Sequence, residues 1–256
     1  MPEIIVIANQ KGGVGKTTTS INLAAALHKI NYKTLLVDLD SQGNATSASG
    51  LNRSTEKASV YDVLMGLKNI EECFVTSEHD GFTLLPSNSD LMAAEIEMLS
   101  IQNREAVLKE KINSISREFD YILIDSPPSM NILTLNALAA GNEIIIPVQC
   151  EYYALEGMSG LLESIYKIKE TINPNLQIKG VLRTMFDSRN SLSIEVSAQL
   201  KKYFGDKLFW TFIPRNVRLA EAPSHGMSAV SYDPECLGSK AYLSLAKEVT
   251  KKTMES

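Results

Sequence analysis

Several features that define other classes of protein are absent from this 256-residue sequence. The chain has only three cysteines, Cys73, Cys150 and Cys236, and no two of them form the C-x-x-C pair of a zinc or redox site. The N-terminus lacks the basic region, long apolar stretch and cleavage site of a signal peptide. No apolar run approaches the ~20 residues that span a bilayer. We therefore expect a cytoplasmic protein with reduced thiols and no stable membrane insertion.

Internal repeats, low-complexity tracts and Pro/Gly/Ser-rich linkers are also absent, so nothing in the sequence marks a domain boundary. The composition, with 44% hydrophobic and 21% charged residues, is that of a globular protein long enough to bury one substantial core. We expect residues 1–256 to form a single domain.

Short apolar, β-branched runs alternate with helical patterns along most of the chain. Runs that are apolar at nearly every position are typical of strands covered on both faces, as in a parallel sheet. The runs span residues 3–9, 33–40, 82–87, 120–129, 142–149, 178–185 and 209–216. Helices are predicted over Thr17–Ile30, Ala93–Phe119, Leu133–Ala140, Leu155–Ile172 and Ile194–Tyr203, and in part around Val60–Leu67. The alternation predicts an α/β fold with a doubly wound, mostly parallel sheet flanked by helices.

A glycine-rich loop follows the first predicted strand and leads directly into a helix. Glycines let backbone N–H groups converge on a phosphate, and the helix N-terminus adds further donors and a favourable dipole. In such a loop Lys16 neutralises the β- and γ-phosphates and the Thr17 hydroxyl ligates Mg²⁺. The general G-x-x-x-x-G-K-[ST] pattern is broken because Gln10 occupies the first glycine position. The residues of this loop assigned to ATP binding are Gly12, Gly13, Val14, Gly15, Lys16, Thr17 and Thr18.

Two further predicted strands end in carboxylates, at the edge of a parallel sheet where ligands bind. The second run ends in Asp38 and Asp40, whose side chains point the same way if the strand continues to its last residue. The run over residues 120–129 delivers Asp125 beside the phosphate loop, where a carboxylate holds hydrated Mg²⁺. Transfer of a phosphoryl group to water needs a metal ion and a group that positions the water. These residues predict Mg²⁺-dependent ATP hydrolysis.

The last predicted strand offers two residues to an adenine ring. Pro214 supplies a flat apolar wall, and Asn216 supplies paired hydrogen-bond donors and acceptors. We assign both to ATP binding.

Longer strings carry a resemblance to a known family. The string K-G-G-V-G-K-T-T at residues 11–18 resembles the deviant Walker A loop of the ParA/MinD/nitrogenase-iron-protein group. The strings Q-C-E-Y-Y-A-L-E-G at 149–157 and I-P-R-N-V-R-L-x-E-A-P-S-H-G at 213–226 resemble chromosomal ParA/Soj proteins. The similarity extends from about residue 3 to about residue 249, and it implies a P-loop ATPase of the ParA/MinD type.

The resemblance also implies residue roles. Lys11 reaches across an ATP-dependent homodimer to the partner's phosphates, and Asp40 orients the attacking water. Lys11, Lys16 and Asp40 are therefore the expected catalytic residues. Ser41 stands where the family usually has proline, and we expect this departure to loosen the turn without removing any chemistry.

The expected partners are non-specific double-stranded DNA and a ParB-type centromere-binding protein. Residues 178–256 carry 12 Lys and Arg against 8 Asp and Glu, whereas the other residues carry 13 against 22. Arg189 and Arg218 match family positions associated with DNA contact, and such contacts go mainly to phosphates and weaken with salt. The resemblance thus implies a nucleoid-associated ATPase that drives chromosome or plasmid partitioning.

Three other functions were weighed against this one. A MinD-like ATPase positions proteins on a membrane or other surface, but the segment after Val249 lacks the apolar face of a membrane-binding helix. An iron–sulfur enzyme of the nitrogenase type needs a cysteine near the dimer axis, and none lies between Asp125 and Cys150. A binding module without hydrolysis is disfavoured by Asp40, although Ser41 leaves it open. Cys150 is interpreted as a core thiol.

Overall fold

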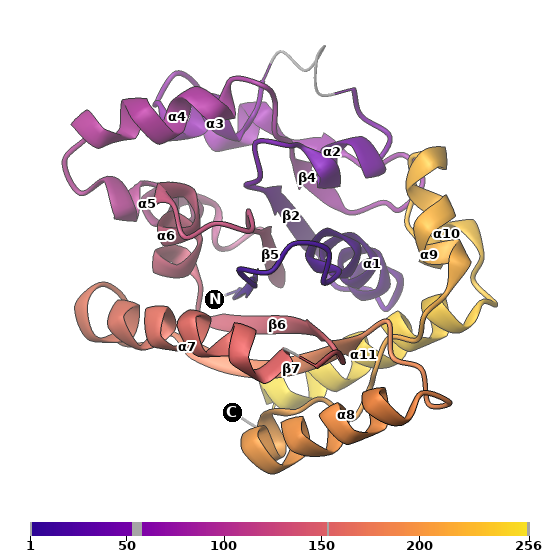
Figure 1. The fold of residues 1–256 in the computed structure, drawn as a ribbon. Coiled ribbons are helices and arrows are strands. Elements are labelled where there is room, and N and C mark those ends of the chain that lie inside the picture. Colours follow the sequence, from indigo (N-terminus) through magenta and orange to yellow (C-terminus); the bar gives the residue numbers. More distant parts are fainter. Residues whose placement is uncertain (1, 53–57, 153, 255–256) are drawn as a thin grey trace.

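A seven-stranded sheet forms the centre of the molecule, with helices on both of its faces (Figure 1). The structure is a computed structural model, and it describes residues 2–52, 58–152 and 154–254. The strand order is β3-β4-β2-β5-β1-β6-β7, and only the pairing of β3 with β4 is antiparallel. The strands are β1 (Glu3–Ile7), β2 (Thr34–Asp38), β3 (Val75–Thr76), β4 (Thr83–Leu85), β5 (Tyr121–Asp125), β6 (Glu143–Gln149) and β7 (Gln177–Thr184). The predicted doubly wound, mostly parallel sheet is confirmed.

The helices pack against the sheet because residues along each strand alternate between two hydrophobic cores. The α-helices are α1 (Lys16–Lys29), α2 (Asn44–Ala48), α3 (Val60–Leu64), α4 (Leu91–Glu97), α5 (Val107–Ile115), α6 (Ile132–Ala140), α7 (Ala154–Thr171), α8 (Ser191–Phe204), α9 (Val217–Glu221), α10 (Ala229–Tyr232) and α11 (Leu237–Met254). In β1, Ile4 and Val6 face the core that includes α5, α6 and α7, and Ile5 and Ile7 face the core that includes α1 and α11. Figure 1 shows α5 and α6 on the opposite side of the sheet from α1.

Short 3₁₀ helices complete the chain and mark several turns. They are η1 (Ile70–Cys73), η2 (Met98–Ser100), η3 (Arg104–Ala106), η4 (Gly205–Lys207) and η5 (Ala222–His225). Cys150 is 4% exposed, which confirms that it is a core thiol, and all three cysteines are unpaired. No helix in the part of the chain that the structure describes is long and apolar enough to cross a membrane.

The single long helix predicted over Ala93–Phe119 is wrong. Helix α4 ends at Glu97 and is followed directly by η2. Helix α5 begins only at Val107. Between them Asn103 adopts a left-handed conformation with φ of 53°, which no α-helix accommodates. Leu91, Ala94 and Met98 are therefore buried by one helical segment and Leu108, Ile112 and Ile115 by another.

The strand predicted over residues 209–216 is also wrong. This segment meets β7 at separate points and not along a continuous ladder. The N–H groups of Phe209 and Ile213 donate to the carbonyl oxygens of Val181 and Arg183, at 3.0 and 2.8 Å, and isolated bridges join Val181 to Leu208 and Phe186 to Pro214. The backbone N–H groups of Trp210 and Thr211 donate to the Glu248 carboxylate of α11, at 2.8 and 2.9 Å, instead of to a neighbouring strand. The segment still runs along β7 and delivers Pro214 and Asn216 to the carboxyl edge of the sheet.

Candidate nucleotide-binding site

The glycine-rich loop connects β1 to α1 at the centre of the sheet. Gly13 and Gly15 have φ angles of 74° and 87°, a left-handed conformation that side chains other than glycine rarely adopt. Gly15 is the N-cap of α1, and no side chain of a described residue caps this helix end. The N–H groups of the first turn are therefore oriented toward an anion above the loop.

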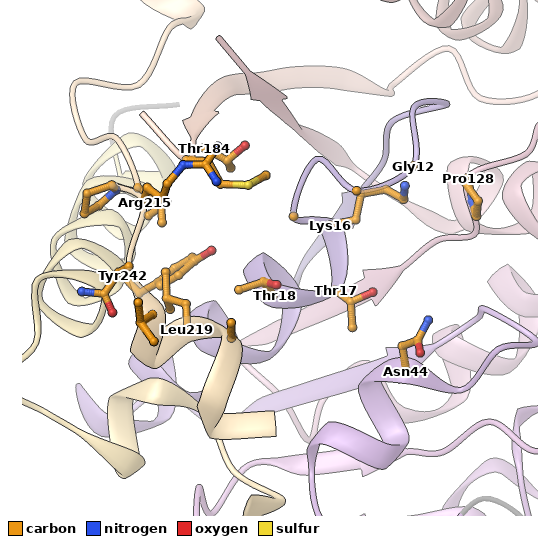
Figure 2. Close-up of a pocket in the computed structure, with 18 of the residues that line it drawn as sticks. Gly12, Lys16, Thr17, Thr18, Asn44, Pro128, Thr184, Arg215, Leu219 and Tyr242 are labelled. Carbon is orange, nitrogen blue, oxygen red and sulfur yellow. The ribbon is translucent and has the colours of Figure 1, made fainter. Parts of the chain in front are cut away.

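A cavity of about 680 Å³ lies over this loop and extends to the segment after β7. Figure 2 shows Arg215, Leu219 and Tyr242 across the cavity from Lys16 and Thr17. Most of the residues assigned to ATP binding line it, namely Gly12, Gly13, Gly15, Lys16, Thr17, Thr18, Pro214 and Asn216. The two exceptions are Lys11 and Val14. The side chain of Val14 is buried, and its carbonyl accepts a hydrogen bond of 2.8 Å from Thr184 Oγ1.

Lys16 brings a cation to the floor of the cavity. The residue is 7% exposed, and its Nζ donates to the carbonyl oxygen of Lys11 at 3.1 Å. Burial lowers the pKa of Lys16, and the charges of Asp125 and Asp40 counteract this shift. A bound polyphosphate would supply the negative charge that such a buried ammonium group needs.

Asp125, at the end of β5, accepts hydrogen bonds from two hydroxyl groups in the first turns of α1. Thr17 Oγ1 and Ser20 Oγ each donate to Asp125, both at 2.8 Å. Burial and the charge of the neighbouring Asp38 together raise the pKa of Asp125 to about 7. One hydroxyl and one carboxylate, completed by water and phosphate oxygens, match the hard-oxygen coordination of Mg²⁺. In the described residues no cluster of three or more His, Cys, Asp or Glu could hold a metal.

Asp38 and Asp40 do not both face the cavity. Asp38 is fully buried and accepts hydrogen bonds from the Thr46 N–H and Oγ1, both at 2.7 Å, so it holds the start of α2. Burial raises the pKa of Asp38 to about 6. Asp40 lines the cavity, and its Oδ1 accepts the Gln42 N–H at 2.9 Å. Both carboxylates lie at the carboxyl end of the sheet, where Asp38 pairs in register with Asp125, but the strand ends at Asp38 and of the two only Asp40 lines the cavity.

The turn after Asp40 is closed by a hydrogen bond from the Gly43 N–H to the Asp40 carbonyl oxygen at 2.8 Å. Gly43 has a left-handed φ of 60° and is the N-cap of α2. That Ser41 makes this turn looser than a proline would stays a prediction.

Lys11 points away from the cavity of its own chain. Its Nζ lies 2.9 Å from a carboxylate oxygen of Glu151, and the two side chains are 45% and 48% exposed. An ion pair as exposed as this contributes roughly 0–1 kcal/mol and is easily exchanged. Lys11 is therefore available to another anion.

The segment from Ile213 to Asn216 closes the far end of the cavity. Asn216 is the N-cap of α9, and its Oδ1 accepts the Arg218 N–H at 2.9 Å, which leaves its amide nitrogen to serve as a donor. Met185 also lines this end and has a left-handed φ of 48°. Together, Pro214, Asn216 and Met185 make an apolar slot with one amide group.

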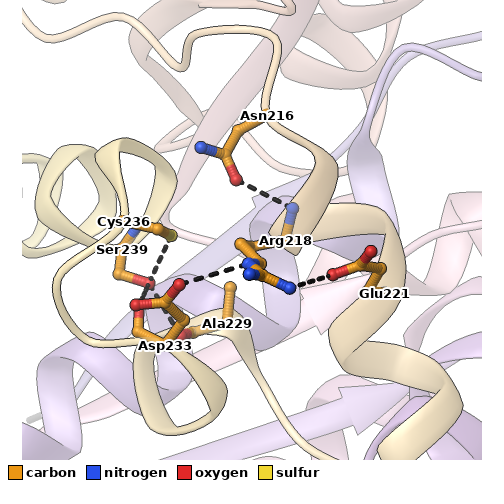
Figure 3. Close-up of polar contacts among 7 residues, drawn as sticks. All are labelled: Asn216, Arg218, Glu221, Ala229, Asp233, Cys236 and Ser239. Atoms are coloured by element: carbon orange, nitrogen blue, oxygen red, sulfur yellow. Dashed lines mark hydrogen bonds and ion pairs between the residues drawn. The ribbon is translucent and has the colours of Figure 1, made fainter.

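The two arginines assigned to DNA lie outside the cavity on different elements. Arg189 precedes α8, its side chain is 88% exposed, and it pairs with Asp187 at 2.9 Å. Arg218 in α9 pairs with Glu221 at 2.7 Å and with Asp233 at 3.3 Å, and its side chain is 49% exposed (Figure 3). Arg189 is thus the more accessible of the two.

Several cavity residues were missed by sequence reasoning. Thr184 and Met185 follow directly from β7, so the rule that ligands bind at carboxyl ends of strands could have found them. Gln42 and Asn44 lie in the loop that was already singled out through Asp40. Tyr242 comes from α11, and no sequence signal marks it.

Comparisons with known proteins agree with this geometry. The family model AAA_31, described as an AAA domain, matches residues 2–178. The chain is 48% identical to the sporulation initiation inhibitor protein Soj of Bacillus subtilis, over 97% of this chain and 98% of Soj. It is 44% identical to the chromosome partitioning protein ParA of Caulobacter vibrioides, over 96% of this chain and 93% of ParA. A solved Mycobacterium smegmatis structure, described as cobyrinic acid a,c-diamide synthase with bound ATP analogue and magnesium, is 34% identical. It has a TM-score of 0.86 and covers 98% of this chain and 95% of its own.

Proposed function

Since the chain belongs to the family of the Soj and ParA chromosome-partitioning ATPases, we propose that it drives partitioning as an ATP-dependent dimer that binds DNA non-specifically. The chain is an ATPase that uses ATP and Mg²⁺. Thr17 and Asp125 would hold the Mg²⁺ ion, which would neutralise the charge of the phosphates. Beyond this activity, we propose roles for individual residues, an ATP-dependent dimer, and binding to DNA and to a ParB-type partner.

Hydrolysis would be divided among three residues of one cavity. Lys16 would neutralise the β- and γ-phosphates, Asp40 would orient the attacking water, and Thr17 would position the metal-bound phosphate oxygens. The observation that carries this assignment is that Asp40, in the loop after β2, and Lys16, the first residue of α1, line the same cavity. The Asp40 carboxylate is 7% exposed and accepts the Gln42 N–H, so its orientation within the cavity is fixed.

Dimerisation would use the lysine that is turned away from its own cavity. Lys11 is half-exposed and its ammonium group is paired with Glu151, so a second subunit carrying ATP could capture it. The phosphates of the partner would offer more negative charge than one carboxylate, which would favour the dimer only when ATP is bound. This coupling makes the protein a switch.

DNA binding would be electrostatic and would use Arg189 and Arg218. Support comes from the exposure of Arg189 and from the excess of basic residues after residue 178. Arg218 would have to exchange Glu221 and Asp233 for a DNA phosphate, so its contribution should be smaller. A ParB-type protein would stimulate ATP turnover and so release the dimer from DNA. While it is bound to DNA, the ATPase would be associated with the nucleoid.

Retention on duplex DNA tests the proposal. The purified protein is sedimented with a non-specific duplex in the presence of no nucleotide, ADP or ATP, over a series of salt concentrations. We expect retention only with ATP, a steep fall with salt, and at least about tenfold weaker binding for Arg189→Glu with unchanged ATP turnover. Lys167→Glu on α7, which makes the same charge change and likewise breaks an exposed ion pair, serves as the control for the Arg189 variant. Retention that is independent of nucleotide would contradict the switch. ATP-dependent dimers with no affinity for DNA would favour a MinD-like role on another surface, with lipid vesicles as the next ligand.

A further inference from the structure

Ser20 lies in the second turn of α1, at a position to which the phosphate-binding motif gives no role. The helix continues into the mostly aliphatic run of residues 21–27, and Ser20 is fully buried like its neighbours. Serine is less favourable than alanine inside a helix, because its hydroxyl competes for backbone acceptors. Burying that hydroxyl adds a further cost unless a hydrogen bond compensates it. A serine at this position therefore needs a good acceptor.

The acceptor is the carboxylate of Asp125. Ser20 Oγ lies 2.8 Å from Asp125 Oδ1 and 3.1 Å from the carbonyl oxygen of Lys16. A hydroxyl carries one proton, so it can donate to only one of these two oxygens at a time. The carboxylate oxygen is the nearer one, and in the ionised form that a metal requires it is also the stronger acceptor. The proton of Ser20 is therefore directed to Asp125.

The two oxygens of the Asp125 carboxylate are held by different residues of α1. Thr17 Oγ1 donates to Oδ2 at 2.8 Å, and Ser20 Oγ donates to Oδ1. Within the part of the chain that the structure describes, these hydroxyls are the only groups that donate to the Asp125 side chain. The χ2 torsion of an aspartate has no sharp preference of its own. The two contacts together therefore set the plane of the carboxylate.

Only one of these two contacts would change when the site is loaded. Thr17 is the proposed ligand of Mg²⁺, so its hydroxyl oxygen would also face the ion. Ser20 comes three residues later and does not line the nucleotide cavity. It would keep its hydrogen bond to Oδ1 and leave Oδ2 on the side of Thr17. Groups that hold a metal ligand from behind in this way orient the ligand and tune its affinity for the metal.

We propose that Ser20 is a positioning residue of the metal site, whose hydroxyl fixes the Asp125 carboxylate so that Asp125 and Thr17 can hold Mg²⁺ together. Ser20 acts only through Asp125 and touches neither nucleotide nor metal. The inference rests on the metal site proposed above, because Thr17 and Asp125 must be the residues that hold the ion. The affinity for metal should depend on Ser20, whereas nucleotide binding without metal should not.

Metal affinity tests the inference without relying on turnover. The probe is Mn²⁺, which prefers oxygen ligands as Mg²⁺ does, and its binding to the complex of the protein with ADP is followed by electron paramagnetic resonance. Ser20→Ala should bind Mn²⁺ about tenfold more weakly than the wild type, because loss of such an outer partner typically weakens metal binding about 10–100-fold. ADP binding in EDTA should stay within about twofold of the wild type, because no phosphate contact is removed.

Ser239→Ala is the matched control. Ser239 is a fully buried serine of α11, and its hydroxyl lies 2.7 Å from the carbonyl oxygens of Ala229 and Asp233. The variant loses a comparable buried hydrogen bond without affecting Asp125, so its Mn²⁺ affinity should match the wild type. Equal Mn²⁺ affinity of Ser20→Ala and the wild type would overturn the inference, and so would an equal loss in Ser239→Ala. A proportional loss of ADP affinity in EDTA would also overturn it, because Ser20 would then support the phosphate loop.

Turnover and a variant of Asp125 separate this inference from the proposed function. The Mg²⁺ concentration for half-maximal ATP turnover should rise about tenfold in Ser20→Ala, with turnover at saturating Mg²⁺ within about threefold of the wild type. A fall in saturated turnover with an unchanged Mg²⁺ requirement would contradict the positioning role. Asp125→Asn should lose more Mn²⁺ affinity than Ser20→Ala. If Asp125→Asn binds Mn²⁺ like the wild type, the proposed metal site itself is wrong. If only Ser20→Ala does so, the metal site stands and the inference alone fails.

Discussion

Three aspartates at the carboxyl ends of neighbouring strands differ in burial, and burial decides what each can do. Asp38 and Asp125 are paired in register across β2 and β5, and both are fully buried. Each is satisfied by hydroxyl or N–H donors of the chain. Asp40 lies two residues further along and lines the cavity, so it alone of the three can meet a water at the nucleotide.

Asp40→Ala and Asp38→Ala should therefore fail in different ways. Asp40→Ala should keep ATP binding and slow turnover at least about a hundredfold, because only the group that orients the water is lost. Asp38→Ala should lower the free energy of unfolding by about 1–3 kcal/mol, because the buried Thr46 and Asp40 donors lose their acceptor. Steady-state hydrolysis, nucleotide binding and urea unfolding distinguish the two. Unchanged turnover in Asp40→Ala would refute its role.

A second buried charge cluster lies far from the nucleotide and makes folding sensitive to pH. Lys179 in β7 is bonded to both Glu3, at 3.1 Å, and Glu143, and its side chain is 2% exposed. Burial and the hydrogen bond with Glu3 raise the pKa of Glu143 from its ordinary value of 4.5 to about 7, although Lys179 acts to lower it. The folded chain therefore holds a proton there that the unfolded chain releases.

The stability contributed by that proton is present below pH 4.5 and is lost as the pH rises through about 7. Glu143→Gln cannot ionise, so its unfolding free energy should fall less between pH 5 and pH 8 than that of the wild type, by about 1–3 kcal/mol. Urea unfolding at the two pH values measures the difference. Parallel pH profiles for the two proteins would contradict the assignment.

At the scale of elements, the nucleotide cavity depends on two backbones that meet behind it. Gly50, after α2, and Gly226, after η5, have φ angles of 86° and 68°. A Cβ on Gly226 would lie 2.7 Å from the Gly50 Cα, and backbone atoms cannot easily retreat. Since α2 begins at Asn44 and α9 leads into η5, this contact fixes the distance between two walls of the cavity.

Gly226→Ala should accordingly separate α2 from η5. The matched control is Gly66→Ala, because Gly66 has φ of 69° and nothing lies within 4 Å of its added Cβ. Both variants carry the strain of a left-handed alanine, about 1 kcal/mol, and Gly226→Ala should lose roughly 1–3 kcal/mol more from overpacking. Its KM for ATP should also rise, whereas that of the control should not. Equal losses of stability in the two variants would show that the close approach costs nothing.

Local signals predicted the elements that depend on their own residues. The phosphate loop, β1, β5 and α1 are encoded by contiguous glycines and apolar runs, and they were predicted within a few residues of their bounds. The apolar segment 209–216 is predicted as a strand, but Glu248, 38 residues beyond Trp210, accepts the N–H groups of Trp210 and Thr211 and interrupts the pairing with β7. The break at Asn103 and the contribution of Tyr242 to the cavity likewise depend on packing between distant segments, which no local pattern contains.

At the scale of the whole molecule, the site is assembled along one edge of the sheet from both halves of the chain. Thr184 of β7 holds the Val14 carbonyl of the phosphate loop, and Asn216 and Tyr242 close the cavity from the C-terminal part. Lys11 is the exception, because it lies at this edge but turns toward Glu151. An exposed lysine beside its own phosphate loop, yet outside its own cavity, is accessible to the phosphates of a second chain, as the proposed dimer requires.

Lys11→Ala and Glu151→Gln separate the two contacts of this lysine. Both variants break the ion pair within the chain, but only Lys11→Ala removes the charge that would reach the partner's phosphates. We expect Lys11→Ala to bind ATP and stay monomeric in sedimentation velocity. Glu151→Gln should dimerise with ATP within about fivefold of the wild-type affinity, because an exposed pair contributes roughly 0–1 kcal/mol. ATP-dependent dimers of Lys11→Ala would disprove the crossing role. Loss of dimers in both variants would instead mean that Glu151 itself belongs to the interface, and that the pair must be formed for two chains to close on ATP.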